Sequence, residues 1–149
     1  MHIPPHDNQN NPIVGPDHDL IPLTYFNIVM LKAGETFDYR VKGYETCVVP
    51  ATGTVDVETM GETYAGIGNR GADVWDGEPE GVYVPSDAGC RITARTDTEC
   101  FIAGAKFDEQ LKPFAVRQAE LDLVQYGSDD TETHRKIKHI LGAGHHDRG

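Results

Sequence analysis

Apolar and polar positions alternate in several short stretches of this chain. In FDYRVK, residues 37–42, aromatic and aliphatic side chains occupy every second position and charged side chains occupy the positions between them. CRITA, residues 90–94, shows the same alternation. Successive side chains of a β-strand point to opposite faces of a sheet. Both stretches therefore predict strands with one apolar and one polar face.

Similar short runs, rich in β-branched and aromatic residues, fill the middle of the chain. Between Tyr25 and Lys106 they read YFNIVMLK, TFDYRVK, ETCVVP, GTVDVET, ADVW, GVYVP, CRITART and ECFIAGAK, separated by Gly, Pro, Asp or Thr-Gly breaks. Runs with this spacing are typical of antiparallel sandwiches and barrels. An all-β domain is predicted over residues 23–106.

The two ends of the chain have a different character. Residues 1–22 contain four prolines before Pro22 and little periodicity, which predicts an extended N-terminal arm. Residues 107–149 predict a C-terminal appendage and linker. Within it LDLVQY indicates a strand, whereas RKIKHIL is compatible with a short helix or a strand.

Charge and cysteine content narrow the classes of partner. The 149 residues include 13 basic and 24 acidic side chains, a net charge of -11 that repels phosphate backbones and anionic lipid. No segment approaches the ~20 apolar residues of a membrane span, and no signal-peptide pattern opens the chain. The three cysteines include no C-x-x-C pair and suit a reducing compartment. We expect a cytoplasmic protein with no nucleic-acid or membrane partner.

Two sequence features suggest cofactor chemistry but lack its context. GIGNRG, residues 66–71, matches G-x-G-x-x-G, yet the following ADVWDGEPEG cannot open a helix, so we predict a glycine-rich turn between strands. Cys90 is interpreted as a small buried side chain rather than a reactive thiol. The histidines all lie outside the strand runs and are interpreted as solvated side chains: His2, His6, His18, His134, His139, His145 and His146.

One charged set is more informative. Asp38 and Arg40 project from the same face of their predicted strand, and Glu45 opens the next strand. All three residues could therefore converge on a ligand-binding cavity inside a barrel. The alternative is a solvated face with surface ion pairs, and the sequence leaves both open.

The order of these segments resembles a known family. Residues 34–58 and 70–94, GETFDYRVKGYETCVVPATGTVDVE and RGADVWDGEPEGVYVPSDAGCRITA, are similar to the N-terminal cupin half of the 5-deoxy-glucuronate isomerases of myo-inositol catabolism. That family includes uronate ketol-isomerases of pectin breakdown. The sharpest part is D-G-x-P-x-x-x-Y-V-P at residues 76–85. The resemblance implies one cupin, a jelly-roll-like β-barrel, in which residues 76–79 form a turn between strands.

The resemblance also implies a second barrel that this chain lacks. In the family, three histidines and a glutamate of the C-terminal cupin, where a P-P-H-x-H motif lies, hold a divalent metal. That motif does not occur in these residues. Laid on this chain, the ligand positions of a metal-binding cupin fall on Asp38, Arg40, Glu45 and about Cys90. Because the guanidinium of Arg40 is always charged and opposes a cation, we expect no metal or other cofactor in this chain.

Three functions follow as hypotheses. The first is a non-catalytic N-terminal half that scaffolds a catalytic barrel or pairs with itself. The second is a stand-alone cupin that binds a small anionic sugar, with Arg40 as the first choice for holding a uronate carboxylate. The third is a small isomerase whose metal is held by tail histidines and Glu45 across a dimer. A barrel that packs against a second barrel has an apolar face to cover, so we expect a homodimer.

Overall fold

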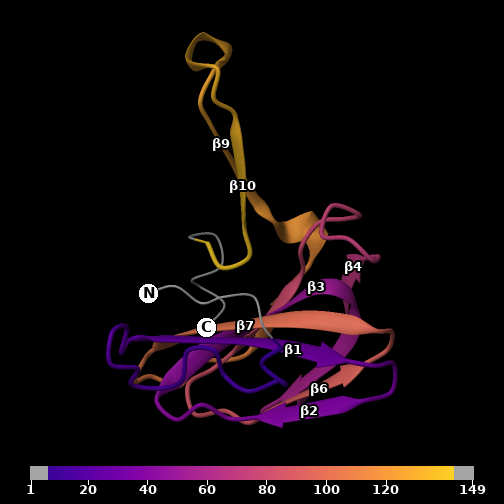
Figure 1. Ribbon diagram of the computed structural model, residues 1–149, viewed down its shortest axis with the longest axis vertical. Helices are drawn as coiled ribbons and strands as arrows, with labels where there is room; N and C mark the ends of the chain where they lie inside the picture. Colours follow the sequence, from indigo (N-terminus) through magenta and orange to yellow (C-terminus); the bar gives the residue numbers. More distant parts are fainter. Residues whose placement is uncertain (1–6, 143–149) are drawn as a thin grey trace.

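The structure, a computed structural model, describes residues 7–142 (Figure 1). Within this range there is no α-helix, and no helix long and apolar enough to cross a membrane. The predicted all-β architecture is confirmed. The main body contains eight strands: β1 (Thr24–Leu31), β2 (Thr36–Tyr39), β3 (Tyr44–Thr59), β4 (Glu62–Arg70), β5 (Gly81–Val84), β6 (Cys90–Ala94), β7 (Thr98–Lys106) and β8 (Phe114–Val116).

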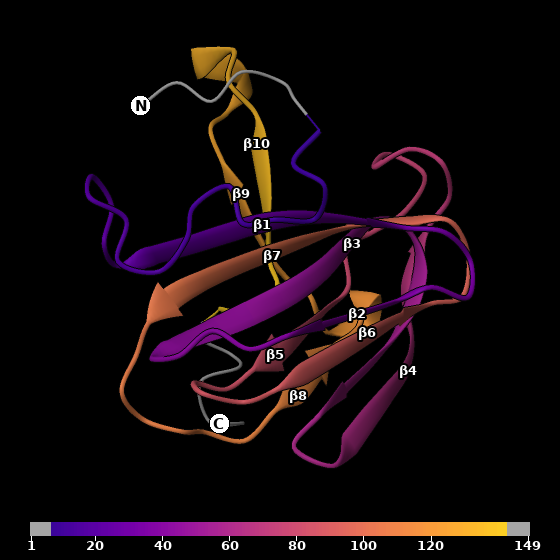
Figure 2. The same ribbon diagram turned by 60° about the horizontal axis from the view of Figure 1, so that its bottom comes forward.

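Strand β3 is shared by two packed sheets (Figure 2). Its first half pairs antiparallel with β7 and β5, and β1 and β8 complete the order β1-β7-β3-β5-β8. Its second half pairs with β6 and β4, and β2 lies beyond β6. The register shifts between Pro50 and Thr52, and Gly53 follows with a φ of 74°. This bend turns one strand from the first sheet into the second.

The space between the sheets holds the hydrophobic core. Val29, Val48 and Ile102 of the first sheet and Val57 and Ile92 of the second have no exposed surface. Each such side chain contributes roughly 1.5–3 kcal/mol through the removal of apolar surface from water. The core therefore stabilises the packing of one sheet on the other.

The alternation seen in the sequence matches the burial of the side chains. On β2, Phe37 and Tyr39 pack against the core while Asp38 is exposed. On β6, Ile92 is fully buried while Arg91 is exposed. The same holds for β5, because Val82 and Val84 join the core and Tyr83 does not.

Residues 7–22 form an extended segment beside β1. Val14 makes an isolated antiparallel bridge with Phe26 and is itself buried. The side chain of Asn10 bonds the backbone of Met30 twice, at 2.8 and 3.2 Å. The remainder of the predicted arm, residues 1–6, lies outside the described residues, as do residues 143–149 of the predicted linker.

The motif GIGNRG lies largely within a strand, so the predicted glycine-rich turn is wrong. Gly66 and Gly68 of β4 have φ values of 63° and 97°. The pairing of β4 with β3 shifts register twice, between Gly53 and Val55 and between Val55 and Val57. Each shift places an extra residue in β4, which is a β-bulge, and glycine permits the positive φ that such bulges use.

A buried carboxylate fixes this bulged strand to the rest of the body. Glu80, only 6% exposed, accepts hydrogen bonds from the backbone N–H of Gly68 at 3.0 Å and of Gln118 at 3.2 Å. The guanidinium of Arg117 donates to it at 3.0 Å and to the carbonyls of residues 65 and 66 at 2.7 Å. Burial of a carboxylate is tolerated because its oxygens have such donors.

Three other expectations about strands are corrected. ETCVVP and GTVDVET form the single strand β3 rather than two strands. ADVW, residues 72–75, lies in the loop between β4 and β5, where all four residues are exposed. The sequence analysis missed β4 and β8. Strand β8 pairs with β5 and so extends the main sheet beyond residue 106.

Strands β9 (Asp122–Tyr126) and β10 (Arg135–His139) form a hairpin that projects from the body (Figure 1). The short 3-10 helix η1 (Gln118–Glu120) precedes its base, and η2 (Asp129–Thr131) forms its tip. The strand predicted at LDLVQY is confirmed, and the open alternative at RKIKHIL is decided in favour of a strand. A two-stranded hairpin without a third strand is marginally stable in water.

We expect Glu80→Ala to lower the free energy of unfolding by about 3 kcal/mol, because it leaves the charge of the Arg117 guanidinium without its carboxylate and the Gly68 N–H without its acceptor. Urea denaturation followed by circular dichroism measures the change. Glu62→Ala is the matched control, since Glu62 is an exposed carboxylate on β4, the strand that Glu80 binds. This substitution should change the free energy of unfolding by less than about 0.5 kcal/mol. Equal effects of the two substitutions would contradict the role given to Glu80.

Candidate functional site

Polar inward-facing side chains lie close together beside β2, and two of them, Tyr39 and Cys90, line an open pocket of about 360 Å³. The hydroxyl groups of Tyr39 and Thr46 lie 2.8 Å apart, with Cys90 beside them. Burial, followed by the proximity of Cys90, raises the pKa of Tyr39 well above its usual range. This cluster is neutral and internally hydrogen-bonded.

The cysteines are part of the same buried environment. Cys47, Cys90 and Cys100 are free thiols, and burial raises the pKa of each to about 12. A thiolate is the nucleophile and the metal ligand, so a raised pKa makes both roles unfavourable. The interpretation of Cys90 as a small buried side chain agrees with its burial and its place on β6.

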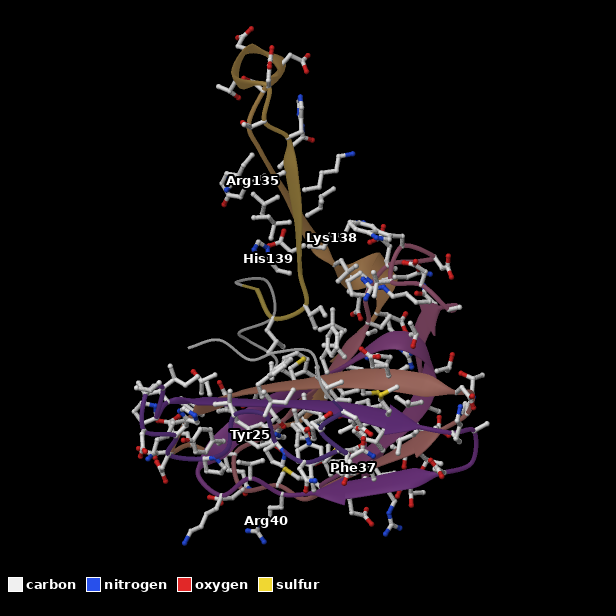
Figure 3. All side chains as sticks on the ribbon, viewed as in Figure 1. Tyr25, Phe37, Arg40, Arg135, Lys138 and His139 are labelled. Carbon is white, nitrogen blue, oxygen red and sulfur yellow. The ribbon has the colours of Figure 1, made fainter. Side chains whose placement is uncertain are left out.

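The structure does not bring Asp38, Arg40 and Glu45 together in a cavity. Asp38 faces solvent and accepts two hydrogen bonds from Arg91, at 2.7 and 3.0 Å, which lower the pKa of its carboxyl group. Figure 3 shows Arg40 pointing away from the barrel. Within residues 7–142 its guanidinium has no hydrogen-bond or ion-pair partner. Their side of β2 is thus the solvated face that the sequence left as an alternative.

Glu45 lies on the other sheet, on the face away from the core. Its carboxylate accepts a hydrogen bond from the hydroxyl of Tyr83 at 2.7 Å. Burial, together with this carboxylate, raises the pKa of Tyr83 above its usual range. Tyr83 also stacks on Phe114, with ring centroids 5.1 Å apart. The carboxylate of Glu45 thus serves a local contact; ligand binding by Asp38, Arg40 and Glu45 stays a prediction.

The metal-ligand positions assigned from the sequence are displaced by one residue from those that point inward. Phe37 and Tyr39 face the core, whereas Asp38 and Arg40 do not. A shift of one residue along a strand moves a side chain to the opposite face of the sheet. Neither register supplies a complete set of ligands for a divalent metal: Asp38 is a carboxylate but Arg40 beside it is a fixed cation, and Phe37 and Tyr39 offer no imidazole, carboxylate or thiolate. Within the described part of the chain, no group of three or more His, Cys, Asp or Glu side chains is placed to hold a metal ion.

The histidines proposed for a shared metal site are also dispersed. His134 pairs with Asp129 at 2.8 Å at the hairpin tip, and Nδ1 of His139 lies 3.7 Å from Asp122 at its base. Nδ1 of His18 accepts the backbone N–H of Leu20. The other four histidines lie outside the described residues.

One surface groove has a volume of about 560 Å³, and we call it the cationic groove. The loop between β4 and β5 forms one wall and the base of the hairpin forms the other (Figure 3). Arg70, Lys136 and Lys138 line it with positive charge, and Glu78 pairs with Lys138. The side chain of Trp75, also in the lining, is 89% exposed.

The loop wall of the groove is held by its own hydrogen bonds. The guanidinium Nε of Arg70 donates to the carbonyl of Gly77 at 3.0 Å. The carboxylates of Asp73 and Asp76 accept the backbone N–H groups of Trp75 and Asp73, at 2.9 and 3.0 Å. Trp75 is thus presented to solvent by a fixed turn.

Positive charges beside an exposed indole suit an anionic ligand with a flat or apolar part. The cationic groove could not be predicted from local sequence pattern, because its two walls lie about 60 residues apart in the chain. The basic run RKIK, next to an acidic stretch in an acidic chain, was the available signal.

Comparisons with known proteins agree with the resemblance found in the sequence. The model of the KduI/IolB family matches residues 3–148. Two proteins named 5-deoxy-glucuronate isomerase, from Bacillus subtilis strain 168 and subspecies natto, are 30% identical over 122 residues. The match covers 80% of this chain and 44% of theirs, so the chain spans less than half the length of these relatives.

Solved structures confirm the cupin jelly-roll prediction at the level of the fold. An IolB-like protein from Salmonella typhimurium LT2 superposes with a TM-score of 0.73 at 24% identity, covering 80% of this chain and 44% of that one. The protein Ylba from E. coli superposes with a TM-score of 0.54 at 13% identity, covering 74% and 45%. The two sheets remain open at their edges, as in a jelly roll.

The three thiols should be inert in the folded protein. At pH 8 a thiol with a pKa of about 12 is ionised roughly 1000-fold less than an ordinary one. Ellman's reagent should therefore modify none of them in native protein and all three in urea. Because the folded state favours the neutral thiols, the free energy of unfolding should fall as pH rises from 9 toward 12. Fast labelling of one native thiol would contradict this assignment.

Proposed function

The chain belongs to the KduI/IolB family, and from that premise we propose that it is a non-catalytic cupin barrel that acts as the N-terminal half of a 5-deoxy-glucuronate isomerase. Its role is to scaffold a catalytic barrel rather than to carry out isomerisation itself. The length of the match supports a role as one half of a two-barrel protein, since the matched residues cover 44% of each isomerase sequence.

The observation that carries the proposal is the chemistry of the inward-facing positions. Converting an aldose into a ketose moves a proton between neighbouring carbons, which needs a base and stabilisation of an enediolate. Among the described residues, the polar groups inside this barrel include the hydroxyls of Tyr39 and Thr46, the amide of Asn27 and the thiols of Cys90 and Cys100, whose protons are held by raised pKa values. None of these groups accepts a proton readily near neutral pH, and together they do not form a metal-ligand set.

The purified chain should contain less than about 0.1 equivalent of zinc or manganese after dialysis against these ions, because the described residues offer no ligand set. It should also leave 5-deoxy-glucuronate unchanged over hours of incubation. Inductively coupled plasma mass spectrometry and proton NMR of the sugar provide the two readouts. A stoichiometric metal together with turnover would overturn the proposal and favour an isomerase with a metal site built across a dimer.

A second candidate function is binding of a small anionic sugar without turnover. One observation favours it, namely that the guanidinium of Arg40 is exposed and lacks a partner within residues 7–142. A carboxylate of a uronate can accept two parallel hydrogen bonds from such a group. Because Arg40 lies on an open surface, a ligand there would be held chiefly by this one contact.

Replacing Arg40 tests the second candidate. If the chain binds glucuronate, Arg40→Ala should weaken binding about tenfold or more, because a charge-assisted hydrogen-bonded pair is lost. Isothermal titration calorimetry measures the affinity. Lys42→Ala is the matched control, since Lys42 is another exposed cation in the same stretch, and it should leave the affinity within about twofold. If the unsubstituted chain does not bind glucuronate, the second candidate function is excluded and scaffolding remains as the proposed function.

A further inference from the structure

We propose that two copies of this chain form a symmetric dimer in which the acidic hairpin tip of each copy occupies the cationic groove of the other. The tip comprises residues 127–134 and the groove is the one between the β4–β5 loop and the hairpin base. This inference concerns self-association and holds whether or not the chain is catalytic.

Acidic side chains gather at the hairpin tip, and basic side chains follow along β10. Asp129, Asp130 and Glu132 are all exposed at the tip, and only Asp129 has a partner there, His134. On β10, Lys136 near the tip end of the strand and Lys138 near its base end both line the groove, while Asp122 at the base lies near His139. Two hairpins that align antiparallel about a two-fold axis therefore place each acidic tip beside the basic side chains of β10 in the other copy. A tip cannot reach the groove at its own base, because the intervening strands are straight (Figure 1).

The groove is the part of this surface best suited to an acidic segment. Residues 7–117 contain nine basic and eighteen acidic side chains, so most of the body repels an acidic tip. In the groove, three cations line the wall and one of them is already paired with Glu78. Charge complementarity of this kind fixes the orientation of two partners and excludes other arrangements.

Apolar side chains provide the second reason to expect a protein occupant. Trp75 at the groove is 89% exposed, and Leu123 and Tyr126 on β9 are each more than half exposed. Ile137 on β10 is 40% exposed. Exposed tryptophan, tyrosine and arginine are the residue types that dominate binding at protein interfaces. A free sugar acid would cover the groove but would leave the apolar hairpin in water.

The marginal stability expected of an isolated hairpin also favours a dimer in which the two hairpins pack together. The hairpin has two strands, and its side chains are mostly exposed along its length. Hairpins of this kind need a third strand or a packed surface to persist. A second hairpin lying alongside supplies that surface to both copies at once.

Charge reversal at each half of the contact tests the dimer. The unsubstituted chain should be a dimer by light scattering at about 100 µM and should dissociate as salt is raised. Asp129→Lys with Asp130→Lys and Glu132→Lys reverses the tip, and Arg70→Glu with Lys136→Glu reverses the groove. Each variant should be monomeric, with a dimer Kd raised about 30-fold or more. Circular dichroism checks folding, and Lys136→Glu alone replaces the double variant if Arg70→Glu disturbs the loop.

Mixing provides the decisive measurement. In an equimolar mixture of the two variants, both contacts of a heterodimer again join opposite charges, so the dimer should return. Asp108→Lys with Glu109→Lys is the matched control, because it reverses two exposed acidic side chains elsewhere on the body and should leave the dimer intact. A monomeric unsubstituted chain, a dimer that survives both reversals, or a mixture that stays monomeric would each overturn the proposal. Glucuronate binding to a monomeric chain, lost in the groove variant, would assign the groove to small anions instead.

Discussion

The arrangement of the body depends on one buried carboxylate. Glu80 lies in the acidic loop before β5, and its donors come from the bulged strand β4 and from the residues after β8. Through Arg117 the same group also reaches two further carbonyls of β4. It thereby positions the loop that presents Trp75, the strand that carries Arg70, and the segment that leads into the hairpin. This one charge therefore joins the strand at one side of the cationic groove to the segment that leads into the hairpin at the other.

The buried carboxylate of Glu80 also explains the glycines of GIGNRG, residues 66–71. In dinucleotide-binding proteins the backbone N–H groups of a G-x-G-x-x-G segment approach a phosphate. Here the N–H of Gly68 approaches an anion as well, but the anion is the carboxylate of Glu80 in the same chain. Side chains are excluded at Gly68, where an added Cβ would lie 2.6 Å from the carbonyl oxygen of Gly53. The glycines of GIGNRG therefore allow the backbone of β4 to approach the carboxylate of Glu80 closely.

Much of the fold could be predicted from the sequence where burial alternates along a strand. FDYRVK and CRITA gave the correct faces because one side of each strand covers the core. Strand β4 was missed because bulges and glycines break its alternation, and β8 because three residues carry too little pattern. The bend of β3 could not be seen either, since it depends on which strands pair with each half. The groove requires two distant segments to meet, and local pattern does not contain that information.

The continuous strand β3 couples the two halves of the barrel mechanically. Its first half lies at the centre of one sheet and its second half at the centre of the other. Opening either sheet must displace a strand whose remaining half is hydrogen-bonded in its neighbour. The body should thus lose structure as a single cooperative unit, whereas the hairpin, which shares no strand with it, can open independently. Amide hydrogen exchange would then divide the molecule into one slow body and one fast appendage, along a boundary set by connectivity rather than by burial alone.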